Sequence, residues 1–311
     1  MDGTIKPNWA DDCWKDMLVF QRKSMWLEGT VKRLAAWLDL KQGMTAVDVG
    51  CGLGYLGYTF WPFFGQGGHY IGVDNTPELV KEAEKDAAGW ADGGRAKFVE
   101  GDAYKLPLPD NYADLVMCQT LLIHLDDPEK AVAEMIRVAK PGGLILCNEP
   151  DNHNPGLGRM YNSVSELSID DHLFCARVHM ICHQGRIKLG LGDGSIGPKV
   201  PHMLKAQGLI DIDVRNNDRV HYLEPPYDGP LQQSALEHVR RSWLDPARRK
   251  VLMAQQKEFF LAGGGEPDDY ECYLEIIDPY MEIMREQVES GEYFSCAPTS
   301  FFTIKARKPG G

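Results

Sequence analysis

Short apolar runs alternate with amphipathic segments along the first half of the chain. Five runs have the length and composition of buried strands: TAVDV, HYIGVD, KFVEGD, ADLVMCQ and LILCNEP. Between the last two, DDPEKAVAEMIRVAK has helical periodicity, with Asp127 as the N-cap and Pro128 at the first helical position. Strands that alternate with capped helices form right-handed βαβ units. The pattern therefore predicts an α/β fold with a doubly wound, mostly parallel sheet.

Three other segments of this half are predicted helices. Residues 11–40 repeat apolar side chains at helical spacing and stop before Gly43. The segment NTPELVKEAEKDAAG has Thr76 as its N-cap and Gly89 as its end. In YLGYTFWPFF, Pro62 limits the helix that begins after the first strand.

The regular alternation of predicted strands and helices changes after residue 150. Polar and glycine-rich residues surround one predicted helix in SELSIDDHLFCARVHMICHQ, and a helix and a strand follow in PKVPHMLKAQGL and IDIDVRNND. Residues 231–290 are almost wholly helical with a break at GGGEP, and SFFTIKARK is a last strand. We expect an N-terminal helical extension at 1–42, a core at 43–230 with an inserted segment at 151–197, a helical cap at 231–295 and the last core strand at 296–311.

The composition is that of a globular protein. With 311 residues, 43% of them hydrophobic, the chain can bury a full core. The net charge of -12 argues against nucleic acid as a partner, because such binding depends on Lys and Arg displacing counterions. No apolar run approaches the roughly 20 residues that span a bilayer, and the first residues lack the pattern of a secretion signal. We expect a cytoplasmic protein with no membrane partner.

Eight cysteines are scattered along the chain without a CxxC pair. Cys51, Cys118 and Cys147 fall in or beside predicted central strands. We therefore expect reduced, buried thiols instead of a disulfide framework.

The stretch VDVGCGLGYLG places four glycines and a cysteine directly after the first strand. A glycine-rich turn between a parallel strand and a helix lets a ligand approach bare backbone, with N–H groups available to an anionic group. We expect a cofactor cleft there, at the carboxyl ends of the strands. Gly52, Gly54 and Gly57 also match GxGxxG, and Asp74 follows Gly52 by 22 residues, where the acid of a dinucleotide site would lie. A nicotinamide-dependent oxidoreductase is therefore one alternative.

Four ordered motifs resemble those of the class I S-adenosylmethionine-dependent methyltransferases over residues 43–150. They are VDVGCGLG, IGVD, GDA after the third strand and KPGG before the fifth, with a polar residue after the fourth strand. The resemblance implies a Rossmann-like sheet with strands six and seven at 209–214 and 300–306. It implies S-adenosylmethionine as the methyl donor and S-adenosylhomocysteine as the product. An oxidoreductase does not explain GDA or PGG, whereas a module that binds the donor without turnover stays a second alternative.

The resemblance implies that ten residues bind the donor: Asp48, Gly50, Cys51, Gly52, Gly54, Asp74, Asn75, Asp102, Ala103 and Gln119. Asp74 would accept both ribose hydroxyls. Asp102 would accept the adenine amino group, and the Ala103 N–H would meet a ring nitrogen. Gln119 would offer its carbonyl to the ammonium group of the donor. Asp48 would brace the turn or reach the ammonium through water.

The implied reaction is in-line transfer of the methyl group to a nucleophilic atom of the acceptor. Because the donor is already activated, the protein supplies positioning, exclusion of water and, for a hydroxyl or carbon acid, removal of a proton. The candidates for that base follow strand ends or lie in the inserted segment, and none is singled out: His124, Glu149, His153, His172 and His179.

One helical stretch, HLFCARVHMICH, carries side chains that bind zinc. His172, Cys175, His179 and either Cys182 or His183 fall at steps of three and four, on one helical face. One straight helix offers at most two or three ligands to one ion, so another segment would have to complete the site. We expect a packed or pocket-lining face with hydrogen-bonded histidines and assign no metal.

Elements outside the core are expected to select the acceptor. They are the N-terminal helix with Trp14, Arg22 and Trp26, residues 151–197, and the helical cap. Aromatic side chains of these elements either line an acceptor pocket or pack in the core: Tyr161, Phe174, Tyr270 and Tyr273. So much covering structure suggests a small-molecule acceptor, and the cap could equally form a homodimer surface.

Overall fold

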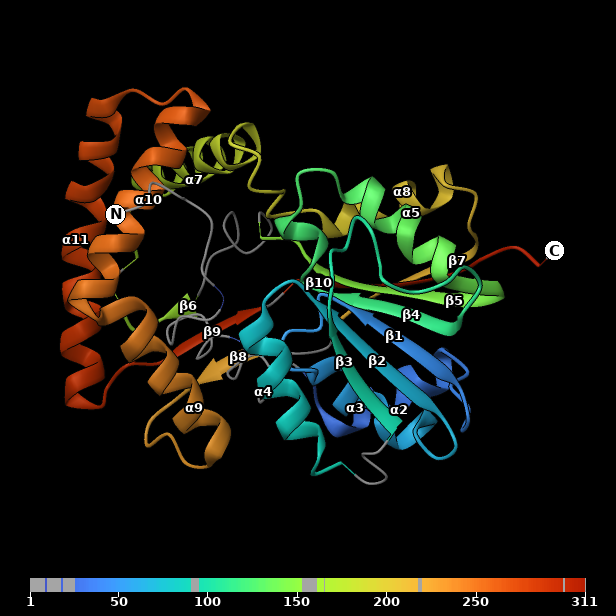
Figure 1. Ribbon diagram of the computed structural model, residues 1–311. Coiled ribbons are helices and arrows are strands. Elements are labelled where there is room, and N and C mark those ends of the chain that lie inside the picture. Colours follow the sequence, from blue (N-terminus) through green and yellow to red (C-terminus); the bar gives the residue numbers. More distant parts are fainter. Residues whose placement is uncertain are drawn as a thin grey trace. The chain divides into compact units, whose positions relative to one another are not determined.

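The chain forms two compact units. The sheet unit comprises Asn8–Asp151, Ser195–Asp218 and Phe301–Gly311, and the helical unit comprises Asn152–Gly194 and Arg219–Ser300 together with Met1–Pro7. The elements of both are labelled in Figure 1. This computed structural model describes Trp9, Leu18 and residues 26–90, 95–152, 161–164, 166–217, 220–298 and 300–310. None of the helices in these ranges is long and apolar enough to cross a membrane.

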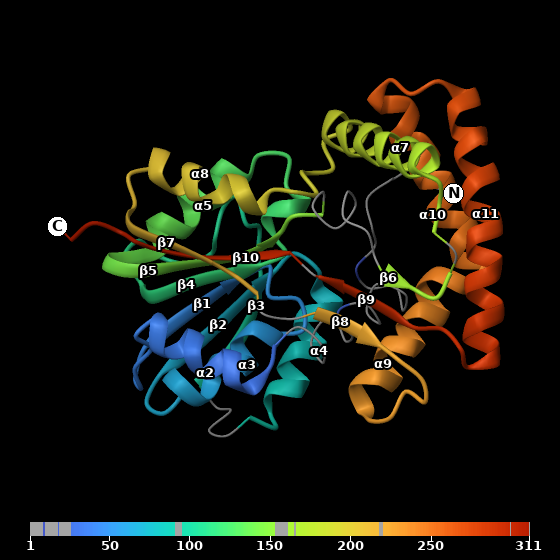
Figure 2. The ribbon, with the colours of Figure 1, turned by 180° about the vertical axis from the view of Figure 1, so that it is seen from behind.

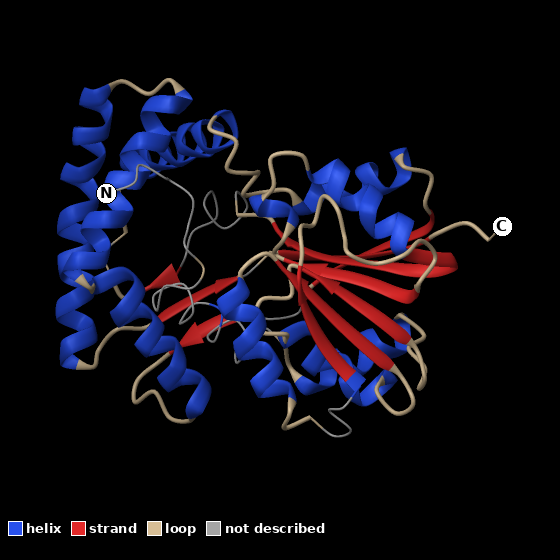
Figure 3. Ribbon diagram, in the orientation of Figure 1, coloured by secondary structure: helices blue, strands red, loops and turns tan. Residues whose placement is uncertain are grey.

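The sheet unit is built on one seven-stranded sheet with the order β3-β2-β1-β4-β5-β10-β7. Figure 3 shows its strands in red, and Figure 1 labels them. The pairs among β1 to β5 are parallel, and β10 runs antiparallel to β5 and β7. The predicted fold class is confirmed, including its sixth and seventh strands. The strands are β1 Thr45–Val49, β2 His69–Asp74, β3 Ala96–Glu100, β4 Ala113–Gln119, β5 Ala139–Pro150, β7 Ile210–Asn216 and β10 Phe301–Arg307.

Helices cover both faces of this sheet (Figure 2). Side chains of β4 alternate between two cores: Leu115 and Met117 pack with one set of helices, Val116 and Cys118 with the other. The first set is α2 Glu28–Trp37, α3 Tyr55–Phe64 and α4 Pro77–Ala87. The second is α5 Pro128–Val138 and α8 Val200–Ala206, with the short η2 Leu122–His124 and η3 Gly197–Lys199. Burial on both faces explains why the central strands are continuous apolar runs.

Several local predictions are confirmed and two are wrong. The Asp127 side chain caps α5, and α3 extends only two residues past Pro62. Thr76, however, makes no side-chain cap to α4; instead its own N–H donates to Asp74. The strand β5 begins at Ala139, where a helix and turn were expected, because the backbone here already pairs with β4. Of the predicted helix 11–40, residues before 26 lie outside the described ranges except Leu18, which is helical.

The helical unit carries four α-helices among its described residues and a small antiparallel sheet of order β6-β9-β8. The predicted helical block and its break before Pro267 are confirmed. The small sheet is not predicted, because its strands have only two to four residues. The elements are α7 Ile169–Lys188, α9 Pro230–Val239, the π-helical η4 Arg240–Leu244, α10 Pro246–Gly263, α11 Pro267–Ser290, β6 Tyr161–Asn162, β8 Val220–Leu223 and β9 Ser295–Pro298.

Helices α7 and α10 approach each other backbone to backbone through two glycines. A Cβ at Gly185 would lie 1.7 Å from the Phe259 carbonyl oxygen, and one at Gly263 would lie 2.1 Å from the Ile181 carbonyl oxygen. Neither carbonyl can move aside without bending its helix. The close contact of the two helices therefore requires glycine at both positions.

Gly185→Ala is expected to destabilise the helical unit by at least about 2 kcal/mol, because its methyl group would overlap the α10 backbone. Gly29→Ala is the matched control, since Gly29 is also helical and its added carbon would meet only Arg33 Nη1 at 3.5 Å. That change should be neutral or stabilise α2 by up to about 1 kcal/mol. Urea unfolding followed by circular dichroism compares the two, and equal transition midpoints would contradict the proposed packing.

Candidate active site

The glycine turn after β1 has a left-handed backbone at three alternate residues. Gly50, Gly52 and Gly54 have φ angles of 67°, 52° and 74°. The turn is held against β2, because the Gly50 and Cys51 N–H groups donate to the Val73 carbonyl at 2.8 and 3.0 Å. Glycine is thus required here by backbone conformation.

The three glycines differ in what surrounds them. A Cβ at Gly50 would lie 2.7 Å from Leu121 Cδ1, and one at Gly54 would lie 2.7 Å from Phe98 Cε1. At Gly52 the nearest atom is Leu18 Cδ1 at 3.9 Å. Gly50 and Gly54 are therefore packed, whereas Gly52 presents bare backbone with room beside it.

Asp74 ends β2 next to this turn, and its carboxylate is held by backbone. Oδ2 accepts the Gly52 N–H at 2.8 Å and Oδ1 accepts the Thr76 N–H at 2.9 Å. The residue is buried, while its neighbour Asn75 is exposed. Each carboxylate oxygen keeps a second lone pair, so the carboxylate is oriented and can still accept hydrogen bonds from a ligand.

Asp48 is buried beneath the turn and acts as a brace. It accepts the Tyr70 hydroxyl at 2.9 Å, and the Gly57 N–H also faces it. Burial raises the pKa of Asp48 to about 7, with a smaller upward effect from Asp74 and opposing effects from the two hydrogen bonds. A Cβ at Gly57 would lie 2.2 Å from the Tyr70 ring, so the third glycine of GxGxxG is required by packing.

The loop after β3 brings Asp102 and Ala103 to the same edge of the sheet. Asp74 is paired in register with Glu100, and the Gly101 N–H donates to the Asp74 carbonyl at 2.9 Å. Asp102 is exposed, and its Oδ1 accepts the Tyr104 N–H at 2.9 Å. Tyr104 fixes the loop further, because its hydroxyl donates to Asp126.

Gln119, at the end of β4, has a partner that the sequence does not reveal. The Trp26 indole N–H donates to Gln119 Oε1 at 3.1 Å, although the two residues are 93 apart in the chain. The next residue, Thr120, has a left-handed φ of 50°, and its N–H donates to the Asn148 carbonyl. Trp26 thus reaches the predicted donor residues, while Trp14 and Arg22 lie outside the described ranges.

Glu149 was one candidate base, but its surroundings give it another role. It is fully buried and accepts the N–H groups of Leu121, Leu122 and Ile123 at 2.9 to 3.2 Å. Burial raises the pKa of Glu149 to about 7, although these hydrogen bonds lower it. Its carboxyl therefore holds the loop after β4. His124 in that loop packs edge to face against Trp9 at 4.7 Å, and His153 lies outside the described ranges.

The histidines and cysteines of α7 do not gather around a point. Cys175 and Cys182 are buried, His179 Nε2 lies 3.2 Å from the Tyr273 hydroxyl, and His183 Nε2 lies 3.0 Å from Asp193 Oδ1. Over the described ranges, no group of three or more His, Cys, Asp or Glu side chains could hold a metal ion. These contacts are of the packed and pocket-lining kind.

The aromatic residues expected near an acceptor divide between core and surface. Tyr270 and Tyr273 are buried against α7 and α10, where the Tyr270 hydroxyl donates to the Met253 carbonyl at 2.9 Å. Phe174 packs partly buried against the same cluster, whereas Tyr161 is exposed on β6. Three of the four therefore pack in the helical unit. Cys51, Cys118 and Cys147 are buried and free, as predicted.

Part of the sheet unit is similar to known methyltransferases. Residues 47–147 match the model of a methyltransferase domain. An uncharacterized methyltransferase of Schizosaccharomyces pombe is 39% identical over 110 residues, 34% of this chain and 39% of that protein. A demethylmenaquinone methyltransferase of Desulfitobacterium hafniense is 35% identical over 119 residues, 38% and 47% of the two chains. A ubiquinone/menaquinone biosynthesis C-methyltransferase of Francisella tularensis subsp. novicida is 30% identical over 138 residues, which are 44% of this chain and 54% of that protein. The chain spans 39% to 54% of the length of these relatives.

Two solved structures share the fold. A Bacillus halodurans protein assigned as a methyltransferase has a TM-score of 0.50 at 19% identity, covering 91% of this chain and 98% of that one. Phosphoethanolamine N-methyltransferase 2 of Haemonchus contortus, solved with S-adenosyl-L-methionine, has a TM-score of 0.51 at 17% identity. The match covers 98% of this chain and 60% of that one. At these identities the likeness concerns the fold alone. The GDA and PGG motifs lie inside the matched domain, and these relatives give no support to a nicotinamide enzyme.

The two buried carboxyls predict that the sheet unit is less stable at higher pH. The folded pKa of Asp48 and of Glu149 is near 7, above the ordinary values of 3.8 and 4.5, so between these limits the folded state binds more protons than the unfolded state. Their stabilisation is complete below pH 4 and is lost as the pH rises through 7. From pH 5 to 8 we expect the free energy of unfolding to fall by about 5 kcal/mol, about half of it from each carboxyl.

Asp48→Asn should remove about half of this dependence, because the amide keeps an acceptor for Tyr70 and does not ionise, whereas Glu149 still does. Asp86→Asn, the same change on the exposed surface of α4, is the control. Urea unfolding followed by tryptophan fluorescence at four pH values tests the prediction. Stability that rises from pH 5 to 8, unaltered by Asp48→Asn, would refute it.

Proposed function

We propose that the chain contains a class I S-adenosylmethionine-dependent methyltransferase domain and that it transfers the methyl group of S-adenosylmethionine to a nucleophilic atom of a small-molecule acceptor. The match of residues 47–147 to the model of a methyltransferase domain supports this proposal. The observation that carries the proposal is the Asp74 carboxylate, oriented by the Gly52 and Thr76 N–H groups beside the left-handed turn. A preoriented carboxylate at the end of β2 suits the two neighbouring hydroxyls of a ribose.

The residues at the sheet edge fit the donor. Gly52 offers bare backbone with space beside it. Asp74 keeps a free lone pair on each carboxylate oxygen. The Gln119 carbonyl oxygen accepts the Trp26 N–H and keeps a second lone pair for a ligand. When bound, S-adenosylmethionine supplies an activated methyl group on a positively charged sulfur. In the proposed site, Asp48 braces the turn from below. Asp102 and Ala103, which follow β3, contact the adenine of the donor.

We propose these donor-site roles for ten residues: Asp48, Gly50, Cys51, Gly52, Gly54, Asp74, Asn75, Asp102, Ala103 and Gln119. Their support is their common position at the carboxyl ends of β1 to β4. Cys51 contributes as a small residue of the turn. We assign no catalytic base, and Glu149 is not a candidate because its carboxyl is committed to the loop after β4.

A small-molecule acceptor is supported by two relatives, a demethylmenaquinone methyltransferase and a ubiquinone/menaquinone biosynthesis C-methyltransferase. The acidic net charge speaks against nucleic acid as the acceptor. A homodimer through the helical cap and a cytoplasmic location stay predictions.

Calorimetric titration with S-adenosylmethionine, beside NADH and NADPH under identical conditions, tests the proposed function. We expect saturable binding of the donor and no heat from either nicotinamide. The opposite pattern would mean that GxGxxG marks a dinucleotide site. Transfer of a labelled methyl group to any small molecule would then exclude a module that only binds the donor.

Asp74→Asn is expected to weaken donor binding by about 1.5 to 3 kcal/mol, because a charged acceptor is lost. Glu100→Gln is the matched control: this acid ends the neighbouring strand β3 in register with Asp74 but is exposed. It should bind the donor as the wild type does. The same titration measures both, with circular dichroism to show that both variants are folded, and an unchanged affinity of Asp74→Asn would remove Asp74 from the site.

A further inference from the structure

A hydrogen bond joins the segment before α2 to the end of β4. The Trp26 indole N–H donates to Gln119 Oε1 at 3.1 Å, across 93 residues of the sequence. The indole nitrogen is only a donor, so the amide atom that faces it is the oxygen of the glutamine. The Gln119 amide therefore has a defined orientation in this structure.

Gln119 lies directly beside the glycine turn. Val49, the last residue of β1, pairs in register with Cys118, so the next residues of the two parallel strands, Gly50 and Gln119, are neighbours. The loop after β4 also lies against the turn, because a Cβ at Gly50 would be 2.7 Å from Leu121 Cδ1. In the proposed donor site this is the place of the amino-acid end of S-adenosylmethionine.

The backbone around Gln119 is held on both sides. Gln119 pairs with Asn148 of β5. Thr120 has a φ of 50°, which is rare for a β-branched residue, and its N–H donates to the Asn148 carbonyl at 3.0 Å. Glu149 then holds the N–H groups that follow. None of these backbone contacts restricts the last torsion of the glutamine side chain, which is broad and roughly two-fold.

Trp26 is itself held by packing. Its partly buried side chain packs against the core formed with α2 and α3, and its ring meets Phe60 edge to face with centroids 6.1 Å apart. The following helix α2 begins at Glu28, and the Val31 N–H donates to the Leu27 carbonyl at 3.0 Å. A donor fixed in this way loses little freedom when it holds its partner. Trp26 can therefore restrict the torsion that the backbone leaves free.

We propose that Trp26 is a positioning residue of the donor site, which orients the Gln119 amide for the amino-acid end of S-adenosylmethionine. The inference rests on the proposed function and deepens it, because Trp26 lies outside the matched domain of residues 47–147. Gln119 Oε1 accepts the Trp26 N–H with one lone pair and offers the other to the ammonium group. Without Trp26 the amide can turn its NH₂ group toward the ammonium, and two groups that only donate would then face each other.

Titration calorimetry of the full chain with two ligands tests the proposal. S-adenosylhomocysteine and 5′-methylthioadenosine share the adenosine and the thioether sulfur, but only S-adenosylhomocysteine has the amino-acid end. Trp26→Phe keeps an aromatic ring and removes the N–H. We expect it to weaken S-adenosylhomocysteine at least about fivefold and to change 5′-methylthioadenosine by less than about twofold. Equal weakening of both ligands, or no change in either, would overturn the proposal.

Trp37→Phe is the matched control, because it also removes one indole hydrogen bond. Trp37 ends α2, and its Nε1 donates to Asp213 Oδ2 at 2.6 Å. This variant should bind both ligands as the wild type does. A loss of S-adenosylhomocysteine affinity equal to that of Trp26→Phe would show a general effect of removing tryptophan and refute the specific role.

A second background separates orientation from packing. In Gln119→Glu both terminal atoms are oxygens, so the ammonium meets an acceptor whichever way the group turns. Trp26→Phe should weaken S-adenosylhomocysteine at least about fivefold in the wild type, but less than about twofold when it is combined with Gln119→Glu. An equal loss in both backgrounds would assign Trp26 to packing alone and overturn the proposal.

A third variant keeps the test decisive if Trp26→Phe does not fold. Gln119→Met leaves Trp26 in place and removes the acceptor, so it should weaken S-adenosylhomocysteine at least about tenfold and spare 5′-methylthioadenosine. An unchanged affinity for S-adenosylhomocysteine would overturn the proposal.

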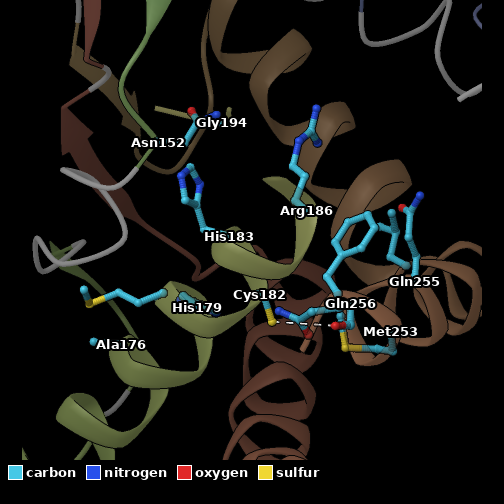
Figure 4. A pocket seen from close by; sticks show the side chains of 13 residues that line it. Asn152, Ala176, His179, Cys182, His183, Arg186, Gly194, Met253, Gln255 and Gln256 are labelled. Carbon is cyan, nitrogen blue, oxygen red and sulfur yellow. Dashed lines mark hydrogen bonds between the residues drawn. The ribbon is translucent and has the colours of Figure 1, made fainter. Parts of the chain in front are cut away.

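Gln256→Met is the control for this variant. Gln256 Oε1 also accepts a hydrogen bond from an aromatic side chain, the Tyr270 hydroxyl at 3.0 Å. Figure 4 shows Gln256 among the side chains that line a hollow with walls from α7 and α10, in the helical unit. The variant should bind both ligands as the wild type does, and a loss equal to that of Gln119→Met would refute the specific role of Gln119.

The wild-type titrations separate this inference from the proposed function. Binding of neither ligand by the wild type would overturn the donor site and this inference with it. Binding of both ligands, without a selective loss in Trp26→Phe, would overturn this inference alone.

Discussion

The functional edge of the sheet depends on the hydrogen bonds that fasten the glycine turn to the end of β2. The Val73 carbonyl accepts two N–H groups of the turn, and the Asp74 carboxylate accepts a third. This fastening forces the left-handed angles that only glycine adopts easily. It also directs Asp74, so the requirement for glycine and the orientation of the acid have one cause.

Carboxyl groups anchor the loops at several strand ends. Asp74 accepts N–H groups of Gly52, after β1, and of Thr76, after β2. Glu149 accepts three N–H groups after β4, and Asp48 faces the Gly57 N–H of α3. Buried N–H groups need partners, and in these loops side chains supply what no strand can. The acids thus let irregular backbone lie against a buried sheet, and burial raises the pKa of Asp48 and of Glu149.

Much of the fold could be predicted because its signals are local and strong. Central strands buried on both faces are continuous apolar runs, and the Asp127 cap lies beside the helix it serves. The turn and Asp74 could be found for the same reason, since backbone conformation restricts the residue type at each glycine. The contacts that no periodicity encodes could not be predicted: the bond from Trp26 to Gln119, the loop-holding role of Glu149, and a sheet of very short strands. Thr76 shows the limit of a local rule, because its hydroxyl donates to the Asn75 side chain and does not cap α4.

Asp48 gives the turn a further property. Its carboxyl lies below the backbone on which the donor would rest, titrates near 7 and responds to the charge of Asp74. The donor carries a positive sulfur that its demethylated product lacks, and such a charge favours the ionised carboxyl. At the proposed donor site, binding near neutral pH would therefore release part of a proton, and formation of the product would take it back. Through Asp48, the proposed site would bind the methyl donor more tightly than the demethylated product by a margin that increases with pH.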